Sequence, residues 1–182
     1  MTDTPMPTKD RLIQTAANLF RTRGYHGVGL ADVLTEAKAP KGSLYHHFPN
    51  GKSDLAMASA TWASDEMLRL IAASFDGADT FEDGATTLCY KLAKLFDITG
   101  WDTCPIANTL FEGPDNDAFR AHAEHIYEGW INEVLDHAER LGLAEGEAKA
   151  KAENVFILIQ GGWMLARARR NSDVLRNLRS MI

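Results

Sequence analysis

The sequence contains little that is typical of membrane, disulfide-rich or β-rich proteins. Its two cysteines, Cys89 and Cys104, provide no disulfide framework and fit a reducing cytoplasm. No apolar run approaches the length of a membrane span, and the first residues lack the basic patch and apolar core of a signal peptide. Proline is absent between Pro49 and Pro105 and again after Pro114, and no segment alternates apolar and polar residues. These absences favour a cytoplasmic, all-α protein.

Catalytic signatures are absent as well. The sequence has no G-x-S-x-G elbow, no phosphate-binding loop, no H-E-x-x-H motif and no repeated E-x-x-H pairs of a di-metal bundle. Adjacent His46 and His47 would point about 100° apart on a helix, which disfavours joint metal binding. His122 and His125, with Glu128 nearby, are a second candidate metal site, but a solvated helix face is the favoured interpretation. We expect no enzymatic activity, no cofactor and no metal.

Charge is distributed unevenly along an acidic chain. The formal net charge is −6, yet residues 1–55 hold seven Lys and Arg against five acids, and the remainder holds 12 against 20. A mildly basic N-terminal segment on an acidic body is typical of a small nucleic-acid-binding head on a larger solvated module.

Apolar spacing of three and four residues predicts helices along most of the chain. Thr8 is the expected N-cap of the first helix, Gly24 ends that helix, and Pro40 precedes the third. The predicted helices cover approximately residues 9–23, 30–37, 41–48, 53–75, 81–98, 105–112, 116–141, 145–171 and 173–182. The first three would form a helix-turn-helix head over 1–52, and the others a helical-bundle body for ligand binding and dimerisation over 53–182.

The run from Ala39 to Phe48, Ala-Pro-Lys-Gly-Ser-Leu-Tyr-His-His-Phe, carries the strongest functional signal. It occupies the position of the helix that a helix-turn-helix places in the DNA major groove. Leu44 and Phe48 are expected to face the core of the head. The residues expected to contact DNA are Lys41, Gly42, Ser43, Tyr45, His46, His47 and, at the start of the next helix, Lys52.

Residues 8–55 resemble the TetR family of one-component transcriptional regulators. The resemblance is carried by Ala16-Ala17-x-Leu19-Phe20, Gly24-Tyr25, Lys41-Gly42-Ser43-Leu44-Tyr45-His46-His47-Phe48, Lys52 and Leu55. Two further features are similar to the branch typified by the repressor LmrA: the extra glycine in Phe48-Pro49-Asn50-Gly51-Lys52, and the run Cys104-Pro105-Ile106-Ala107-Asn108. The resemblance implies a homodimer joined by its last two helices, which binds a near-palindromic operator and releases it when a small molecule enters the body.

The sequence departs from the family pattern at two places in the head. Gly29 precedes Leu30 where the family often has Thr or Ser contacting phosphate, so that side-chain contact would be lost. Lys38-Ala39-Pro40 stands where the family usually has Gly-Val-Ser. Both departures are expected to change which operator sequence is recognised more than whether the protein binds DNA.

Residues 155–166 are apolar on nearly every side, so the helix that contains them needs cover on every side. A second subunit is the favoured cover, and a central core helix in a monomer is the alternative. Gly161 and Gly162 would allow another helix to approach closely. The residues expected at the dimer interface are Phe156, Ile159, Gly162, Trp163 and Ala166.

Aromatic side chains in the body are candidates to line an effector site, although packed core is the alternative for each. The absence of a basic cluster favours an uncharged or cationic apolar effector. Cys104 would lie in a loop before a helix N-terminus, which favours a thiolate and makes it a candidate oxidation or electrophile sensor, whereas Cys89 is expected in the core. The candidate lining residues are Trp62, Phe96, Phe111, Tyr127, Trp130 and Phe156.

The sequence therefore predicts a homodimeric, ligand-responsive repressor that binds double-stranded operator DNA. An activator or an architectural DNA-binding protein would share the same head. The alternative from another class is a helical bundle that binds a small molecule or metal and retains a vestigial helix-turn-helix.

Overall fold

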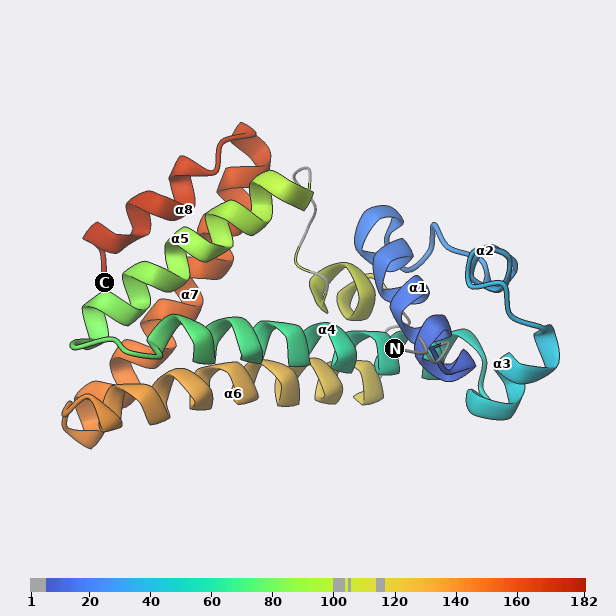
Figure 1. Ribbon diagram of the computed structural model, residues 1–182, viewed down its shortest axis with the longest axis horizontal. Coiled ribbons are helices and arrows are strands. Elements are labelled where there is room, and N and C mark those ends of the chain that lie inside the picture. The colour runs from blue at the N-terminus through green and yellow to red at the C-terminus, as the bar shows by residue number, and fades with distance from the viewer. Residues whose placement is uncertain (1–5, 100–103, 105, 114–116) are drawn as a thin grey trace, which may run out of the picture. The chain divides into compact units, whose positions relative to one another are not determined.

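The computed structural model describes residues 6–99, 104, 106–113 and 117–182, and every regular element within them is helical (Figure 1). The α-helices are α1 (Thr8–Arg23), α2 (Leu30–Glu36), α3 (Lys41–His47), α4 (Lys52–Phe75), α5 (Phe81–Thr99), α6 (Asp117–Arg140), α7 (Glu145–Arg169) and α8 (Asp173–Asn177). A π-helix, η1 (Ala107–Phe111), lies between α5 and α6, and a 3-10 helix, η2 (Leu178–Ser180), follows α8. The all-α prediction is confirmed.

Three predicted details of these elements change. Thr8 is the first residue of α1 rather than its cap, because Pro7 takes the cap position with an extended ψ of 145°. The segment expected as an α-helix over 105–112 contains the π-helix η1, and its predicted start at Pro105 lies outside the described residues. The predicted start of α6 at Asn116 is likewise outside them. The last helix tightens into η2 instead of continuing to the end of the chain.

The first of two compact units comprises the chain up to Ser64 together with residues 105–123. In this unit α1 packs on α2, α3 and η1. Gly24 ends α1 with a φ of +70°, as the sequence predicts, and its N–H donates to the Phe20 carbonyl. The core of the unit is built from fully buried apolar side chains, including Leu12, Phe20, Val33, Leu44 and Leu55.

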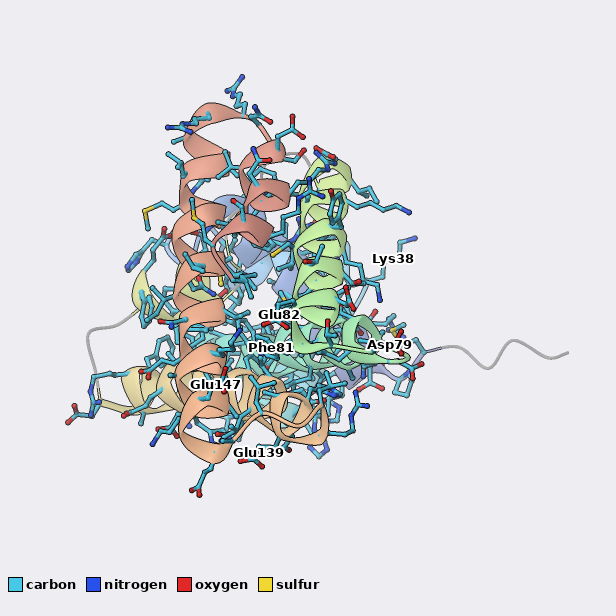
Figure 2. All side chains as sticks on the ribbon, turned by 90° about the vertical axis from the view of Figure 1, so that its left-hand side faces the viewer. Lys38, Asp79, Phe81, Glu82, Glu139 and Glu147 are labelled. Atoms are coloured by element: carbon cyan, nitrogen blue, oxygen red, sulfur yellow. The ribbon has the colours of Figure 1, made fainter. Side chains whose placement is uncertain are left out.

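The second compact unit comprises residues 65–104 and 124–182. Within it α8 packs on α5 and α7 (Figure 1). Figure 2 shows Phe81 and Glu82 at the first turn of α5. Lys151 of α7 pairs with the Glu82 carboxylate, and its ammonium lies 5.3 Å from the centre of the Phe81 ring, so the α7 helix is fixed to the start of α5.

The compact units and the predicted domains divide the chain differently. The prediction places residues 53–64, 106–113 and 117–123 in the body, whereas these residues belong to the same compact unit as the helix-turn-helix. We retain the boundary after residue 52 as a proposal about function. None of the described helices is long and apolar enough to cross a membrane.

Candidate DNA-binding surface

The turn between α2 and α3 sets the angle at which α3 is presented. Gly29 is the N-cap of α2, and its backbone N–H donates to the Asp32 carboxylate at 2.8 Å, which is the half of a capping box that needs no cap side chain. Ala37 is buried and Lys38 turns the chain with a φ of +50°. Pro40, in extended conformation, is the N-cap of α3. The departure at Lys38 therefore places a lysine in the left-handed region that favours glycine.

The α3 helix divides into a buried face and an exposed face. Leu44 is completely buried and Phe48 nearly so, as the sequence predicts. Tyr45 is 45% exposed, and the Lys41 ammonium lies 5.9 Å from the centre of its ring. No atom lies within 4 Å of the position that a Cβ on Gly42 would occupy, so the backbone there is open to a close approach. The exposed face contains Lys41, Gly42, Tyr45 and His46, flanked by half-buried Ser43 and His47.

Lys52, the seventh predicted contact, lies at the first residue of α4 beside a second tyrosine. Its ammonium is 4.3 Å from the centre of the Tyr25 ring, a cation–π distance. Burial lowers the pKa of Lys52 and raises the pKa of Tyr25, whose hydroxyl also hydrogen-bonds Ser53. The Asn50 backbone N–H donates to the Asp54 carboxylate at 2.8 Å and closes the turn before Lys52.

Sequence reasoning missed the roles of Tyr25 and Asn108. The sequence analysis uses Tyr25 only as part of the match to the family pattern. In the structure its ring contacts Lys52, which is 27 positions away in the chain. Asn108 ended a short motif without an assigned function, and its side-chain amide donates to the Arg21 carbonyl at the end of α1 at 3.0 Å. The Cys-Pro-Ile-Ala-Asn run was the available signal, but it does not say what the asparagine touches.

The six candidate effector residues are divided between the two compact units. Tyr127, Trp130 and Phe156 do meet in the second unit, with ring centroids 5.1 to 6.4 Å apart. Phe96 is fully buried there against Trp163, at 5.5 Å between ring centroids. Trp62 and Phe111 belong to the first unit, and Phe111 is 61% exposed.

The two cysteines are both buried. Burial raises the pKa of the Cys89 thiol to about 11, which fits the core position expected for it. Cys104 hydrogen-bonds Tyr127, and the pKa of that phenol is raised by burial and by the neighbouring thiol. Cys104 thus lies outside the regular helices, as the sequence predicts, but it is buried against Tyr127 of the aromatic cluster.

Four of the five predicted dimer residues lie on the face of α7 that is buried in the single chain. Ile159, Gly162, Trp163 and Ala166 are buried within the second unit, and Gly162 faces Leu178 and Leu175. Only Phe156 is half-buried. In a helix that is apolar on every side, the residue pattern does not distinguish one face from another. The sequence therefore could not predict which face of α7 is buried within its own unit. The apolar residues left exposed on α7 are Ile157, Gly161, Met164 and Leu165.

The histidines form no candidate metal centre in the described residues. His122 contacts the Thr61 hydroxyl at 3.0 Å and the Met57 carbonyl at 3.1 Å, so its Nε2 atom is engaged by α4. The rings of His46 and His47 meet edge to face at 4.9 Å. Across the described part of the chain, no group of three or more His, Cys, Asp or Glu side chains is arranged to hold a metal ion.

Comparison with known proteins identifies the family. Residues 12–58 match the bacterial regulatory proteins of the tetR family, and residues 82–181 match the C-terminal domain of LmrA/YxaF-like transcriptional regulators. The HTH-type transcriptional regulator LmrA of Bacillus subtilis (strain 168) is 27% identical over 177 residues, which cover 96% of this chain and 94% of LmrA.

Solved structures agree with this assignment. The regulatory protein TetR from Rhodobacter sphaeroides has a TM-score of 0.80 and 26% identity, covering 94% of this chain and 95% of that one. A cysteine mutant of the TetR family regulator CifR, complexed with 26-bp double-strand operator DNA, has a TM-score of 0.78 and 21% identity, covering 94% and 93%. The chain belongs to the TetR family of DNA-binding transcriptional regulators, in the branch with an LmrA/YxaF-like C-terminal domain.

Proposed function

We propose that the chain is a homodimeric repressor that binds a near-palindromic operator through α3 and leaves it when a small molecule binds the second unit. The exposed polar face of α3 carries this proposal. Its opposite face is fixed in the core by Leu44 and Phe48, so Lys41 and Tyr45 project from a rigid element. Side chains held in this way meet base edges and phosphates with little loss of conformational freedom.

The DNA contacts divide into two kinds. Lys41 and Lys52 supply positive charge for phosphates, and the open backbone at Gly42 admits a sugar-phosphate strand. Ser43, Tyr45, His46 and His47 supply hydrogen-bonding groups along the same helix. In a dimer, two such helices would enter major grooves about 34–36 Å apart, or a multiple of that distance.

Dimerisation is supported by the exposed face of α7. Ile157, Met164 and Leu165 are 59%, 75% and 41% exposed, and Gly161 lies between them on the same side of the helix. Apolar side chains that recur at spacings of three, four and seven form one stripe, and a contiguous exposed apolar stripe marks an interaction site. The same stripe on a second copy matches it, because a two-fold interface pairs identical surfaces.

Effector binding is assigned to the second unit, near Tyr127, Trp130, Phe156 and Cys104. These side chains offer aromatic faces, a thiol and one phenol, and none of them is a Lys, Arg, Asp or Glu. An uncharged or cationic apolar molecule fits this chemistry. It would release the operator only if it binds the DNA-free conformation more tightly than the DNA-bound one.

The test is a gel-shift titration against DNA that flanks the protein's own gene, with unrelated competitor DNA and varied salt. A complex that survives excess competitor supports a local regulator, and the same complex then serves to screen uncharged and cationic apolar compounds for release. A complex that any competitor removes equally would reflect phosphate attraction alone and would contradict the proposal.

A further inference from the structure

Asn108 joins the segment between α5 and α6 to the end of α1. It is 9% exposed, and its side-chain amide donates to the Arg21 carbonyl at 3.0 Å. The Tyr25 backbone N–H donates to the Asn108 carbonyl at 3.1 Å. One residue of η1 therefore holds the chain on both sides of Gly24, and the Glu112 carboxylate fills the place that a Cβ on Gly24 would occupy.

Tyr25 connects the end of α1, which Asn108 holds, to the start of α4. Its ring, 7% exposed, stacks on Phe20 at 5.7 Å and meets the edge of Phe119 at 5.7 Å. Lys52 lies over the same ring at 4.3 Å, and the Tyr25 hydroxyl bonds Ser53. The ring thus packs against α1 and α6 and meets the edge of the neighbouring His26 ring at 5.4 Å, and it also contacts the first two residues of α4.

A lysine has a flexible four-carbon stem, so an unrestrained ammonium samples many positions before it meets a phosphate. The Tyr25 ring restrains it without cancelling its charge, because a ring quadrupole attracts the cation and leaves its three N–H donors available. Lys41 lies over its own tyrosine at the longer distance of 5.9 Å, and that ring is exposed and on the same helix. Of these two lysines, Lys52 is the one that lies over a buried ring, and that ring is fixed by other segments of the unit.

We infer that Tyr25 and Asn108 are positioning residues for Lys52, which they hold ready to contact an operator phosphate. This inference rests on the proposed function, since it requires that Lys52 binds DNA. It assigns a role to Asn108: through this residue and Tyr25, η1 positions the ammonium that makes one phosphate contact.

A double-mutant cycle tests the inference with the full-length protein and its operator duplex. Lys52→Met is expected to weaken binding about fivefold and to reduce the slope of log K against log[salt] by about one. Tyr25→Leu is expected to weaken binding about two- to fivefold when Lys52 is present, with a similar loss of slope. In the Lys52→Met background, Tyr25→Leu should change binding by less than about 1.5-fold, and Tyr25→Phe, which keeps the ring, should bind like the wild type.

The same cycle with Lys41→Met is the matched control. Tyr25→Leu and Lys41→Met should act additively, because the Lys41 ammonium does not lie over the Tyr25 ring. Thermal unfolding followed by circular dichroism establishes that each variant is folded at the assay temperature. If Tyr25→Leu is not folded, Asn108→Ala replaces it, with an expected loss of about twofold that disappears in the Lys52→Met background.

The outcomes separate this inference from the proposed function. If Tyr25→Leu weakens operator binding equally with and without Lys52, its role is generally structural and the inference is overturned. The inference is also overturned if Tyr25→Leu and Lys41→Met are as non-additive in operator affinity as Tyr25→Leu and Lys52→Met. Tighter binding by Tyr25→Leu would show that the ring withholds Lys52, which also overturns it. A wild type that binds the operator specifically while Lys52→Met matches it in affinity and slope would overturn the inference but leave the proposed function standing. Absence of specific binding by the wild type would remove both.

Discussion

The helices α3 and α7 each bury one face within their own unit and leave the other uncovered, but the uncovered faces differ in chemistry. On α3 the exposed residues include Lys41, Tyr45 and His46. On α7 they include Ile157 and Met164. A polar, cationic face matches a polyanion, whereas an apolar face matches another apolar face. The chemistry of the uncovered side, more than the position or length of the helix, therefore indicates which partner each helix takes.

The largest effect is expected from a charge on the α7 face. Met164→Glu should convert the dimer to a monomer and weaken operator binding by at least about 100-fold, since an unpaired charge buried at an interface costs about 3–5 kcal/mol. Sedimentation velocity measures the first change and a gel shift the second. Ile98→Glu, at a side chain 72% exposed on α5, is the matched control and should remain dimeric. A dimer that tolerates Met164→Glu would disprove the assignment of this face.

The next effect concerns the α3 face. Tyr45→Ala should weaken specific operator binding about 10- to 100-fold, and Lys41→Ala about fivefold, while both proteins stay dimeric. Fluorescence anisotropy at several salt concentrations checks both, and only Lys41→Ala should reduce the salt slope, by about one. Full affinity of both variants at low and physiological salt would refute the docking of α3 on DNA.

A several-fold effect is expected from alkaline pH. Burial lowers the pKa of Lys52, so this ammonium loses its proton at a lower pH than an exposed lysine does. DNA binds the protonated form, so operator affinity should fall as pH rises through the lowered pKa of the free protein. Lys52→Arg keeps its charge at every accessible pH and should retain affinity over that range. Parallel pH profiles for the two proteins would contradict a phosphate contact by Lys52.

The smallest effect is expected on thermal stability, from the two residues with positive φ that lie next to α3 and α7. Lys38 before α3 and Arg170 after α7 both adopt positive φ, of +50° and +48°. Replacement of either by glycine should relieve about 1 kcal/mol of strain and raise the melting temperature by about 2–4 °C. Calorimetry measures both shifts, and a lower melting temperature would argue against strain at that residue. Arg170→Gly should leave operator affinity unchanged, because Arg170 lies outside the DNA-binding unit.

Local signals predicted what depends on local geometry. Gly24 ends α1 because its positive φ suits glycine, and Leu44 and Phe48 lie four positions apart on the buried face of α3. The exposed residues of the DNA-binding helix followed directly from those two anchors.

Features that depend on distant partners could not be predicted in this way. The π-helix forms where Asn108 bonds the end of α1, a contact that no short pattern encodes. The buried face of α7 depends on Leu175 and Leu178 of the following elements, and the α7 sequence alone does not contain that information. The division of the aromatic residues between two units likewise becomes visible only in three dimensions.

The proposed function requires that the uncovered face of α3 reads the DNA sequence. The measurement that tests it most directly is the ratio of affinities for the operator and for a scrambled duplex, determined for the wild type and for Tyr45→Ala at physiological salt. We predict a ratio of at least about 1,000 for the wild type. In Tyr45→Ala this ratio should be lower by a factor of at least about ten, while the protein remains dimeric. An unchanged ratio in Tyr45→Ala would contradict the claim, because sequence would then be read by another surface.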